Sequence, residues 1–281
     1  MYPSAFDYVR ASSLADAISL LARHGDDAKV LAGGHSLLPA MKLRLARPAV
    51  VVDIGRIAEL NYIREQGNHI AMGATATHRA IETSPLLLKN CPLLPELAAH
   101  IGDPQVRNKG TIGGSLAHAD PAADWPAAML ALDAEFEIAG PKGRRTVKAA
   151  DFFVGLMQTT LASGEVLCGI LVPQTGRSVA YVKSEQKASG FALCGVAVAV
   201  DAKKGSAAIG ITGVGAIAYR ARAVERALGG KPLTAASIET AAAHAVDGVD
   251  ALSDIHASAE YRAHLARVNT RRALESARAR G

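Results

Sequence analysis

The chain has 281 residues, 49% of them hydrophobic, so it is long enough for about two domains and can bury a substantial core. Its formal net charge is +5, and no run of lysine and arginine exceeds two residues, which gives little support to a nucleic-acid-binding role. The three cysteines, Cys91, Cys168 and Cys194, are scattered, so they predict no metal site, disulfide framework or iron–sulfur cluster. The first residues, MYPSAFDYVR, lack an apolar signal core, and no apolar run approaches the length of a membrane span, so we expect a soluble cytoplasmic protein.

The first part of the chain predicts a small lobe with a parallel sheet, over about residues 1–56. An amphipathic pattern at residues 12–24 predicts a helix that a serine begins and Gly25 ends. The apolar run at 28–32 predicts a short strand, and the β-branched run at 49–55 predicts a buried one. With a short helix between these two strands, the order is that of a βαβ-like unit.

The next part, about residues 57–176, predicts a mixed lobe that is largely antiparallel. Glycine-containing turns separate pairs of apolar runs, which is typical of hairpins, and prolines break the helical stretches. The predicted elements are a hairpin at 61–74, short helices at 77–83 and 92–101, a hairpin at 134–147 and a strand at 165–173.

Residues 173–177 predict a linker, after which strands are followed by helices. Three strands are expected within residues 178–215 and three helices within residues 220–280. This order indicates a compact α+β domain over residues 177–281. We therefore expect an α+β protein, with a two-lobed domain over residues 1–176 and a second domain over the rest.

Two glycine-rich segments stand out, AGGHSL at residues 32–37 and TIGGS at residues 111–115. Both are interpreted as turns, in which free backbone N–H groups can form a nest for anionic oxygens. Two such turns would suit a diphosphate held from two sides, although each alone is also an ordinary structural turn. Neither matches the Rossmann fingerprint or the Walker A loop.

Three polar side chains, His118, Asp120 and Asp124, follow the second glycine segment and precede an apolar helix at residues 125–134. Carboxylates beside a nucleotide site accept hydrogen bonds from sugar hydroxyls, as in dinucleotide-binding folds. Asp124 has a second interpretation, because a carboxylate at the start of a helix is also a good cap. Both interpretations stay open at this point.

These segments carry a resemblance to a known family. AGGHSLLP with the following MKLRLARP, and RNKGTIGGSLAHADPAADWPAAMLALDA, closely resemble the flavin-binding medium subunit of the molybdenum hydroxylases. That family includes carbon monoxide dehydrogenase medium chains and the FAD domain of xanthine dehydrogenase. The resemblance covers nearly the whole chain, with both motifs in the family's order.

The resemblance implies a function for the whole chain as an electron-transfer subunit with non-covalent FAD. Substrate would be oxidised at a molybdenum cofactor on a large partner subunit. Electrons would pass through a small two-[2Fe–2S] subunit to this FAD and on to an external acceptor. A heterotrimer, doubled to (αβγ)2, is implied, with no metal and no catalytic residue on this chain. Substrate and acceptor (NAD, quinone or dioxygen) stay open.

The resemblance also implies which residues contact FAD. The diphosphate would be held by Ala32, Gly33, Gly34, His35, Ser36 and Leu37 on one side and by Thr111, Gly113, Gly114 and Ser115 on the other. From the residues themselves, His35 is also interpreted as a structural side chain. Asp124 would bind the ribityl hydroxyls, and His118 and Asp120 would line the same part of the cofactor.

Three further residues would lie near the ends of the cofactor. Ile101 would pack on the isoalloxazine ring, and Leu167 would lie near the ring or the adenine, although both are also ordinary core residues. Lys183 would lie near the flavin ring, where a cation tunes its chemistry, with Lys187 as a rival. Relatives often carry a polar residue in place of Gly190, so contacts from that loop are in question.

Two alternatives remain. The first is a free-standing FAD-dependent oxidoreductase with its own small substrate, which would need a catalytic base over the ring, and no such constellation stands out. The second is a non-enzymatic binding or assembly subunit, against which the two glycine segments and Asp124 argue.

Overall fold

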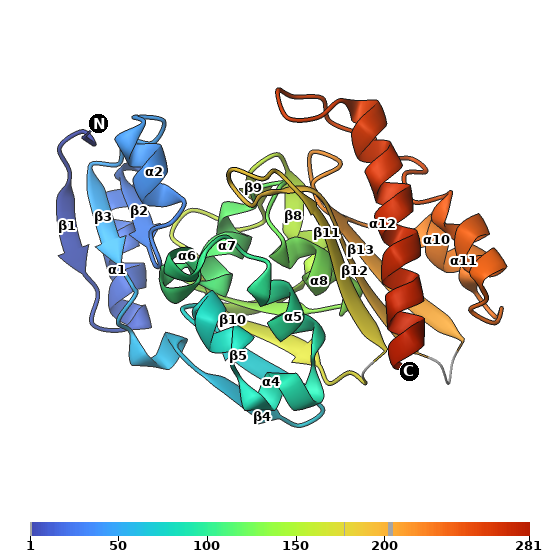
Figure 1. The fold of residues 1–281 in the computed structure, drawn as a ribbon. Coiled ribbons are helices and arrows are strands. Elements are labelled where there is room, and N and C mark those ends of the chain that lie inside the picture. The colour runs from blue at the N-terminus through green and yellow to red at the C-terminus, as the bar shows by residue number, and fades with distance from the viewer. Residues whose placement is uncertain (1, 177, 202–204) are drawn as a thin grey trace.

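The computed structural model describes residues 2–176, 178–201 and 205–281. It is a mixed α+β structure in which three sheets follow one another along the molecule, as Figure 1 shows from the blue N-terminal lobe to the red C-terminal helix. The predicted α+β class is confirmed. Arg177, in the predicted linker, lies outside the described residues.

The N-terminal lobe is built on a three-stranded parallel sheet in the order β1 (Asp7–Arg10), β3 (Val50–Asp53), β2 (Ala28–Leu31). The sequence predicted β2, β3 and the parallel pairing, but not β1. Helix α1 (Leu14–His24) begins at Ser13, whose hydroxyl accepts from the backbone N–H of Asp16, and ends at Gly25, as expected. The remaining elements of the lobe are the 3-10 turns η1 (Gly25–Asp27) and η2 (Ala58–Leu60) and helix α2 (Leu37–Lys42).

A five-stranded antiparallel sheet forms the centre of the molecule. Its order is β4 (Ile63–Gln66), β5 (His69–Gly73), β10 (Val166–Pro173), β6 (Glu135–Gly140), β7 (Gly143–Lys148). Both predicted hairpins and the predicted strand are present. Side chains of β10 alternate between two cores: Val166 and Cys168 pack with the N-terminal lobe, and Leu167 and Ile170 pack with the central helices.

Short helices connect the strands of the central sheet. They are α3 (His78–Glu82), α4 (Pro85–Asn90), α5 (Leu93–Ala99), α6 (Pro104–Lys109), α7 (Ile112–His118), α8 (Trp125–Ala131) and α9 (Ala149–Phe152), followed by the hairpin β8 (Phe153–Gly155) and β9 (Gln158–Thr159). The second glycine segment was predicted as a turn, and this was wrong. Residues 112–115 form the first turn of α7, which Thr111 caps by accepting from the N–H of Gly114.

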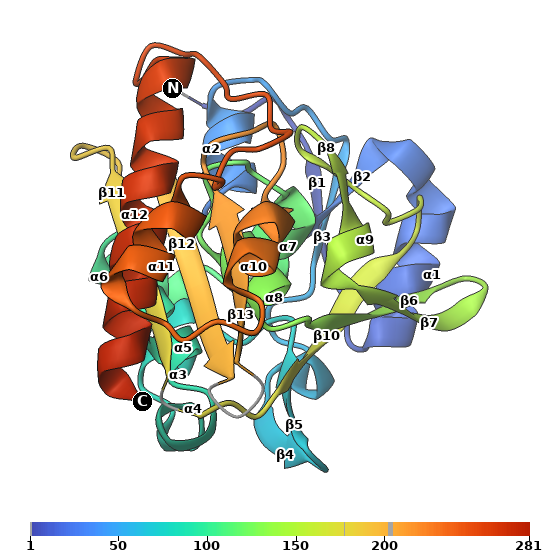
Figure 2. The same ribbon diagram turned by 90° about the vertical axis from the view of Figure 1, so that its right-hand side faces the viewer.

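The C-terminal domain is an antiparallel sheet with helices on both faces. Its strands are β11 (Val179–Glu185), β12 (Ala192–Asp201), β13 (Ser206–Thr212) and β14 (Tyr219–Arg220), in that order. Helices α10 (Arg222–Leu228), α11 (Ala235–Ala242) and α12 (Ala259–Arg280) lie on the outer side, as Figure 2 shows, and the buried helix α8 packs on the inner face. No helix within the described ranges is long and apolar enough to span a membrane.

The sheet of this domain also holds the loop that precedes α8. The Thr212 hydroxyl donates to the carbonyl oxygens of Pro121 and Ala123, at 2.9 and 2.7 Å, and the backbone N–H of Gly213 donates to Pro121 at 2.8 Å. Residues 121–124 therefore take their shape from strands far along the chain.

Candidate functional site

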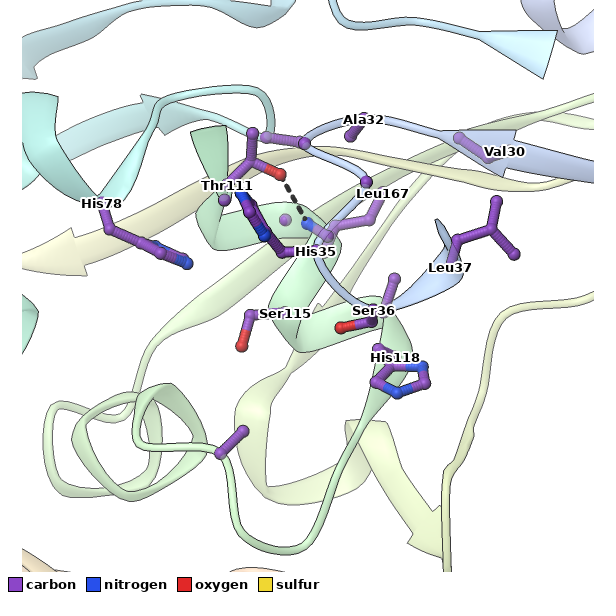
Figure 3. Close-up of a pocket in the computed structure, with 18 of the residues that line it drawn as sticks. Val30, Ala32, His35, Ser36, Leu37, His78, Thr111, Ser115, His118 and Leu167 are labelled. Carbon is purple, nitrogen blue, oxygen red and sulfur yellow. Dashed lines mark hydrogen bonds between the residues drawn. The ribbon is translucent and has the colours of Figure 1, made fainter. Parts of the chain in front are cut away.

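A cavity of about 700 Å³ lies where the N-terminal lobe, helices α6 and α7 and the loop at residues 189–191 meet. Figure 3 shows its wall, with Val30 to Leu37 on one side and Thr111, Ser115 and His118 on the other. Among the residues predicted from the sequence, those that line this cavity are Ala32, Gly33, Gly34, His35, Ser36, Leu37, Ile101, Thr111, Gly113, Gly114, Ser115, His118, Asp124 and Leu167. Asp120 and Lys183 do not line it.

The first glycine segment presents a run of free backbone donors. Within the described part of the chain, none of the N–H groups of residues 33–37 has a protein acceptor, and the first bond of the following helix is from Leu38 to Gly34. Gly34 has a positive φ of 76°, which turns the chain back toward the cavity. Free N–H groups in such a turn form a nest that binds anionic oxygens.

The second glycine segment differs, because its N–H groups are already used. Each of the four groups from residue 112 to residue 115 donates within the protein. The acceptors are, in order, the carbonyls of Ala76 and Ala74, the hydroxyl of Thr111 at 3.1 Å and the carbonyl of Thr111. The segment therefore offers the cavity its side-chain hydroxyls and a flat glycine surface, not the free N–H groups that the sequence predicted.

Close approach of neighbouring backbone segments explains why residues 33 and 113 are glycines. A Cβ at Gly33 would lie 2.1 Å from the carbonyl oxygen of Lys109, and a Cβ at Gly113 would lie 2.6 Å from that of Ala74. At these positions the missing side chain lets protein segments approach each other. Gly114 is different: a Cβ there would meet the Thr111 hydroxyl at 2.8 Å and project toward Ala32 across the cavity.

Asp124 is a buried charge with two partners. Both Tyr181 and Lys183 donate to its carboxylate, and the Nζ of Lys183 lies 3.0 Å away and also donates to the carbonyl of His100 at 2.9 Å. Burial raises the pKa of Asp124, and the charge of Lys183 opposes that shift. Asp124 makes no capping bond to α8, so the capping interpretation was wrong.

Lys183 and Asp120 lie outside the cavity for clear reasons. The Lys183 side chain is 1% exposed, and its Nζ pairs with the Asp124 carboxylate and donates to the carbonyl of His100. It therefore lies behind the wall of the cavity. The carboxylate of Asp120 accepts from the N–H of Ala122 at 2.8 Å and so stabilises the turn before α8. Both residues shape the loop that carries Asp124.

The sequence did not single out several residues of the cavity wall. Phe191 is 51% exposed beside the cavity, and Met157 is 52% exposed at the tip of the β8–β9 hairpin. His78, only 4% exposed, lies in the wall near His35. The aromatic residue directly after Gly190 was a signal for Phe191, whereas nothing in the sequence around His78 pointed to the cavity.

The cavity fits an elongated ligand with a phosphate-bearing centre. Its volume lies in the range of small-molecule sites, about 300–1,000 Å³. The residues that line the cavity beside the free donors include the apolar Val30, Leu167 and Ile101. Within the described residues, no cluster of three histidine, cysteine or acidic side chains is placed to hold a metal ion. A dinucleotide-like cofactor such as FAD matches this arrangement.

Two family profiles match the chain. Residues 4–175 match the FAD binding domain in molybdopterin dehydrogenase, and residues 179–277 match the CO dehydrogenase flavoprotein C-terminal domain.

Individual proteins are similar over the full length. The carbon monoxide dehydrogenase medium chain of Hydrogenophaga pseudoflava is 42% identical, with 100% of this chain and 99% of that protein covered. The nicotine 6-hydroxylase medium subunit of Paenarthrobacter nicotinovorans is 37% identical, with 98% of each covered. A solved structure of carbon monoxide dehydrogenase from Hydrogenophaga pseudoflava superposes with a TM-score of 0.96 at 42% identity, covering 100% of this chain and 99% of that one.

Proposed function

The chain belongs to the FAD-binding medium subunits of the molybdenum hydroxylases, and from this premise we propose that the cavity between its lobes is where it holds FAD. The subunit is the flavoprotein part of an oxidoreductase, and the molybdenum cofactor and the [2Fe–2S] clusters lie on other subunits. When bound, FAD supplies the redox chemistry that no side chain can provide. The protein supplies binding, orientation and charge.

The free N–H groups of residues 33–37 carry this proposal. Five consecutive donors without an acceptor among the described residues are costly unless water or a ligand accepts from them. We assign them to the FAD diphosphate, since bonds from N–H groups to charged oxygens are shorter and stronger than bonds to neutral ones. Across the cavity, the hydroxyl of Ser115 faces the same space, and Gly114 keeps it open.

The remaining contacts follow from the positions of the side chains. Asp124 lines the cavity and keeps lone pairs beyond those that Tyr181 and Lys183 use, so we assign it to the ribityl hydroxyls. Ile101 and Leu167 supply apolar surface for the two ring systems. We assign Lys183 to holding the Asp124 carboxylate and not to direct contact with the flavin ring.

We also propose an assembly in which this chain works. The relatives are medium chains of multi-subunit molybdenum hydroxylases. We propose a large molybdenum subunit and a small iron–sulfur subunit as the partners of this chain, in an (αβγ)2 arrangement. An external acceptor outside these subunits would take the electrons. The three cysteines are free and buried, which is compatible with a reducing compartment, so we place the complex in the cytoplasm. We also propose residues 1–176 as the FAD-binding domain and residues 177–281 as the C-terminal domain.

Reconstitution of the purified chain with FAD tests the proposal. We expect the wild-type chain to quench the fluorescence of added FAD and to acquire a flavin absorption spectrum that denaturation releases unchanged. Gly114→Val should abolish binding, because the added side chain projects from α7 toward Ala32 and fills the gap between the two glycine segments.

Gly176→Ala is the matched control, since Gly176 has open space around it and no positive φ. It should bind FAD as the wild type does. Undiminished FAD binding by a folded Gly114→Val variant would show that the cofactor lies elsewhere. The fold of each variant is checked by circular dichroism before its binding is measured.

A further inference from the structure

His78, the first residue of α3, lines the cavity and has no part in the FAD contacts proposed for the other lining residues. It is 4% exposed, and its ring packs against the fully buried Trp125 with 5.8 Å between ring centroids. The indole Nε1 of Trp125 lies 3.1 Å from Nδ1 of His78. A histidine buried to this degree against tryptophan is held in one orientation.

The bond to Trp125 fixes which ring nitrogen of His78 carries hydrogen. An indole N–H can only donate, so the nitrogen that it meets must accept and carries no hydrogen. In a neutral imidazole the hydrogen then lies on the other nitrogen, Nε2. Trp125 therefore makes His78 a donor at Nε2.

The neutral form is the one present at physiological pH. Burial lowers the pKa of His78 to about 4, and the charges of His35 and Arg107 add to that shift. Within the described residues, no protein group accepts from Nε2. Nε2 is not among the fully buried, unpartnered side-chain atoms of the described residues, and His78 lines the cavity, so this donor is accessible from the cavity. A water molecule or a bound ligand can therefore accept from it there.

The position of Nε2 identifies that acceptor. A Cβ at Gly110 would lie 2.7 Å from Nε2, so the absence of a side chain there leaves room for the imidazole. A Cβ at Gly33 would lie 2.8 Å from the Cα of Gly110. Nε2 therefore lies beside the point where Gly33, in the first glycine segment, approaches Gly110, the residue before Thr111. In Figure 3 the ring of His78 points into the space that Thr111, His35 and Ser115 border.

We propose that His78 is a diphosphate-binding residue, whose Nε2–H donates to a phosphate oxygen of bound FAD from the side opposite the free N–H groups of residues 33–37. The inference rests on the assignment of the cavity to FAD. Trp125 acts as a positioning residue, because it selects the tautomer and orients the ring without reaching the cofactor.

Two variants of the full chain separate the donor from the ring's packing. His78→Leu keeps the volume and removes the donor, and FAD affinity measured by flavin fluorescence should fall about tenfold to a hundredfold. His78→Gln carries a neutral amide that can accept from Trp125 and donate to the phosphate, so its affinity should stay within about threefold of wild type. Equal, undiminished affinity of both variants would overturn the proposal.

Nuclear magnetic resonance on the wild-type chain gives a readout that needs no variant. With ¹⁵N-labelled histidine, we expect an Nε2–H signal for His78 that shifts and exchanges more slowly with water when FAD is added. The phosphorus signals of FAD should differ between the wild type and His78→Leu, with the flavin absorption unchanged. An unmoved Nε2–H signal at saturating FAD, or a flavin shift without a phosphorus shift, overturns the assignment. A wild-type chain that binds no FAD would overturn the proposed function itself.

Discussion

The two glycine segments of this protein look alike in sequence and differ in structure. Residues 33–37 form an open turn whose five N–H groups have no acceptor among the described residues, whereas the N–H groups of residues 112–115 all donate within the protein. The first segment is available to a ligand, and the second is bound to its own scaffold. A glycine pair beside hydroxyl residues therefore identifies a close approach of backbones, but not whether a ligand or the protein occupies the space.

The two sides of the cavity therefore differ in which of their groups are free to bind a ligand. The N–H groups of the first segment have no acceptor among the described residues, so they are available to water or to a ligand. The second segment is braced by a cap at Thr111, by the carbonyls of Ala74 and Ala76, and, farther along, by the ion pair at Asp124. Removing a hydrogen bond or ion pair of the second side should therefore mainly reduce stability, and removing a free donor of the first should mainly reduce cofactor affinity.

The largest effect on the braced side is expected at Lys183. Lys183→Met leaves the Asp124 carboxylate buried without its cation, and breaking such a pair typically costs about 3–5 kcal/mol of unfolding free energy. Urea unfolding at pH 7 measures the loss. Asp124, whose pKa burial already raises, should take up a proton in this variant, so the loss should shrink as the pH falls.

Lys187→Met is the control, because Lys187 is an exposed lysine on the same stretch of chain. Its unfolding free energy should stay within about 0.5 kcal/mol of wild type. A loss below about 1 kcal/mol for Lys183→Met would mean that the pair contributes little to the braced side.

The next effect is a pH dependence from His78, whose backbone N–H donates to the carbonyl of Gly110. Its pKa is lowered from 6.5 to about 4, with burial as the main cause and His35 and Arg107 as the nearby charges. Between pH 6.5 and 4, His78 is protonated in the unfolded chain and neutral in the folded chain. The contribution of His78 to the unfolding free energy is therefore fully present above pH 6.5 and is lost as the pH falls toward 4. The loss is about 3 kcal/mol.

Other histidines also titrate in this range, so the measurement is a difference between two proteins. Unfolding free energies of the wild type and His78→Gln, both without FAD, should converge as the pH falls from 7 to 4.5. Parallel pH curves for the two proteins would show that His78 is not held neutral in the folded chain.

The smallest effects are expected from removing one hydroxyl group in each glycine segment. Thr111→Val removes the acceptor for the Gly114 N–H and should cost about 1 kcal/mol of stability. Ser36 precedes α2 without a capping bond, so Ser36→Ala should leave stability unchanged and weaken FAD binding several-fold. Thermal unfolding and FAD titration of both variants measure the two quantities. The reverse result would show that the second segment, not the first, is the ligand-binding one.

Elements with a strong local pattern were predictable. The hairpin β4–β5, the strand β10 and the helix α1 with its cap at Ser13 follow from alternation, β-branched runs and capping residues. Strand β1 was missed because it is short and largely exposed, and only its pairing with β3 makes it a strand. Helix α7 was missed because glycine is a poor helix former, and long-range bonds to Ala74 and Ala76 hold its first turn.

The site was predictable to the extent that it is local. Fourteen of the sixteen predicted residues line one cavity, since only Asp120 and Lys183 do not. The partnership of His78 with Trp125 joins residues 47 positions apart, and no property of either residue predicts the other. Asp124 and Lys183 are separated by even more of the sequence, at 59 positions. Side chains that act through such pairs become visible only in the folded chain.

Because Thr212 and Gly213 hold the loop at residues 121–124, this loop can take its final shape only after the strands of the C-terminal domain have been synthesised. The ribosome releases the chain N-terminus first, so both glycine segments emerge before the strands that shape this loop. Until then, Asp124 also lacks Lys183. A nascent chain therefore has an incomplete pocket, and the cofactor can be loaded fully only after translation of the C-terminal strands.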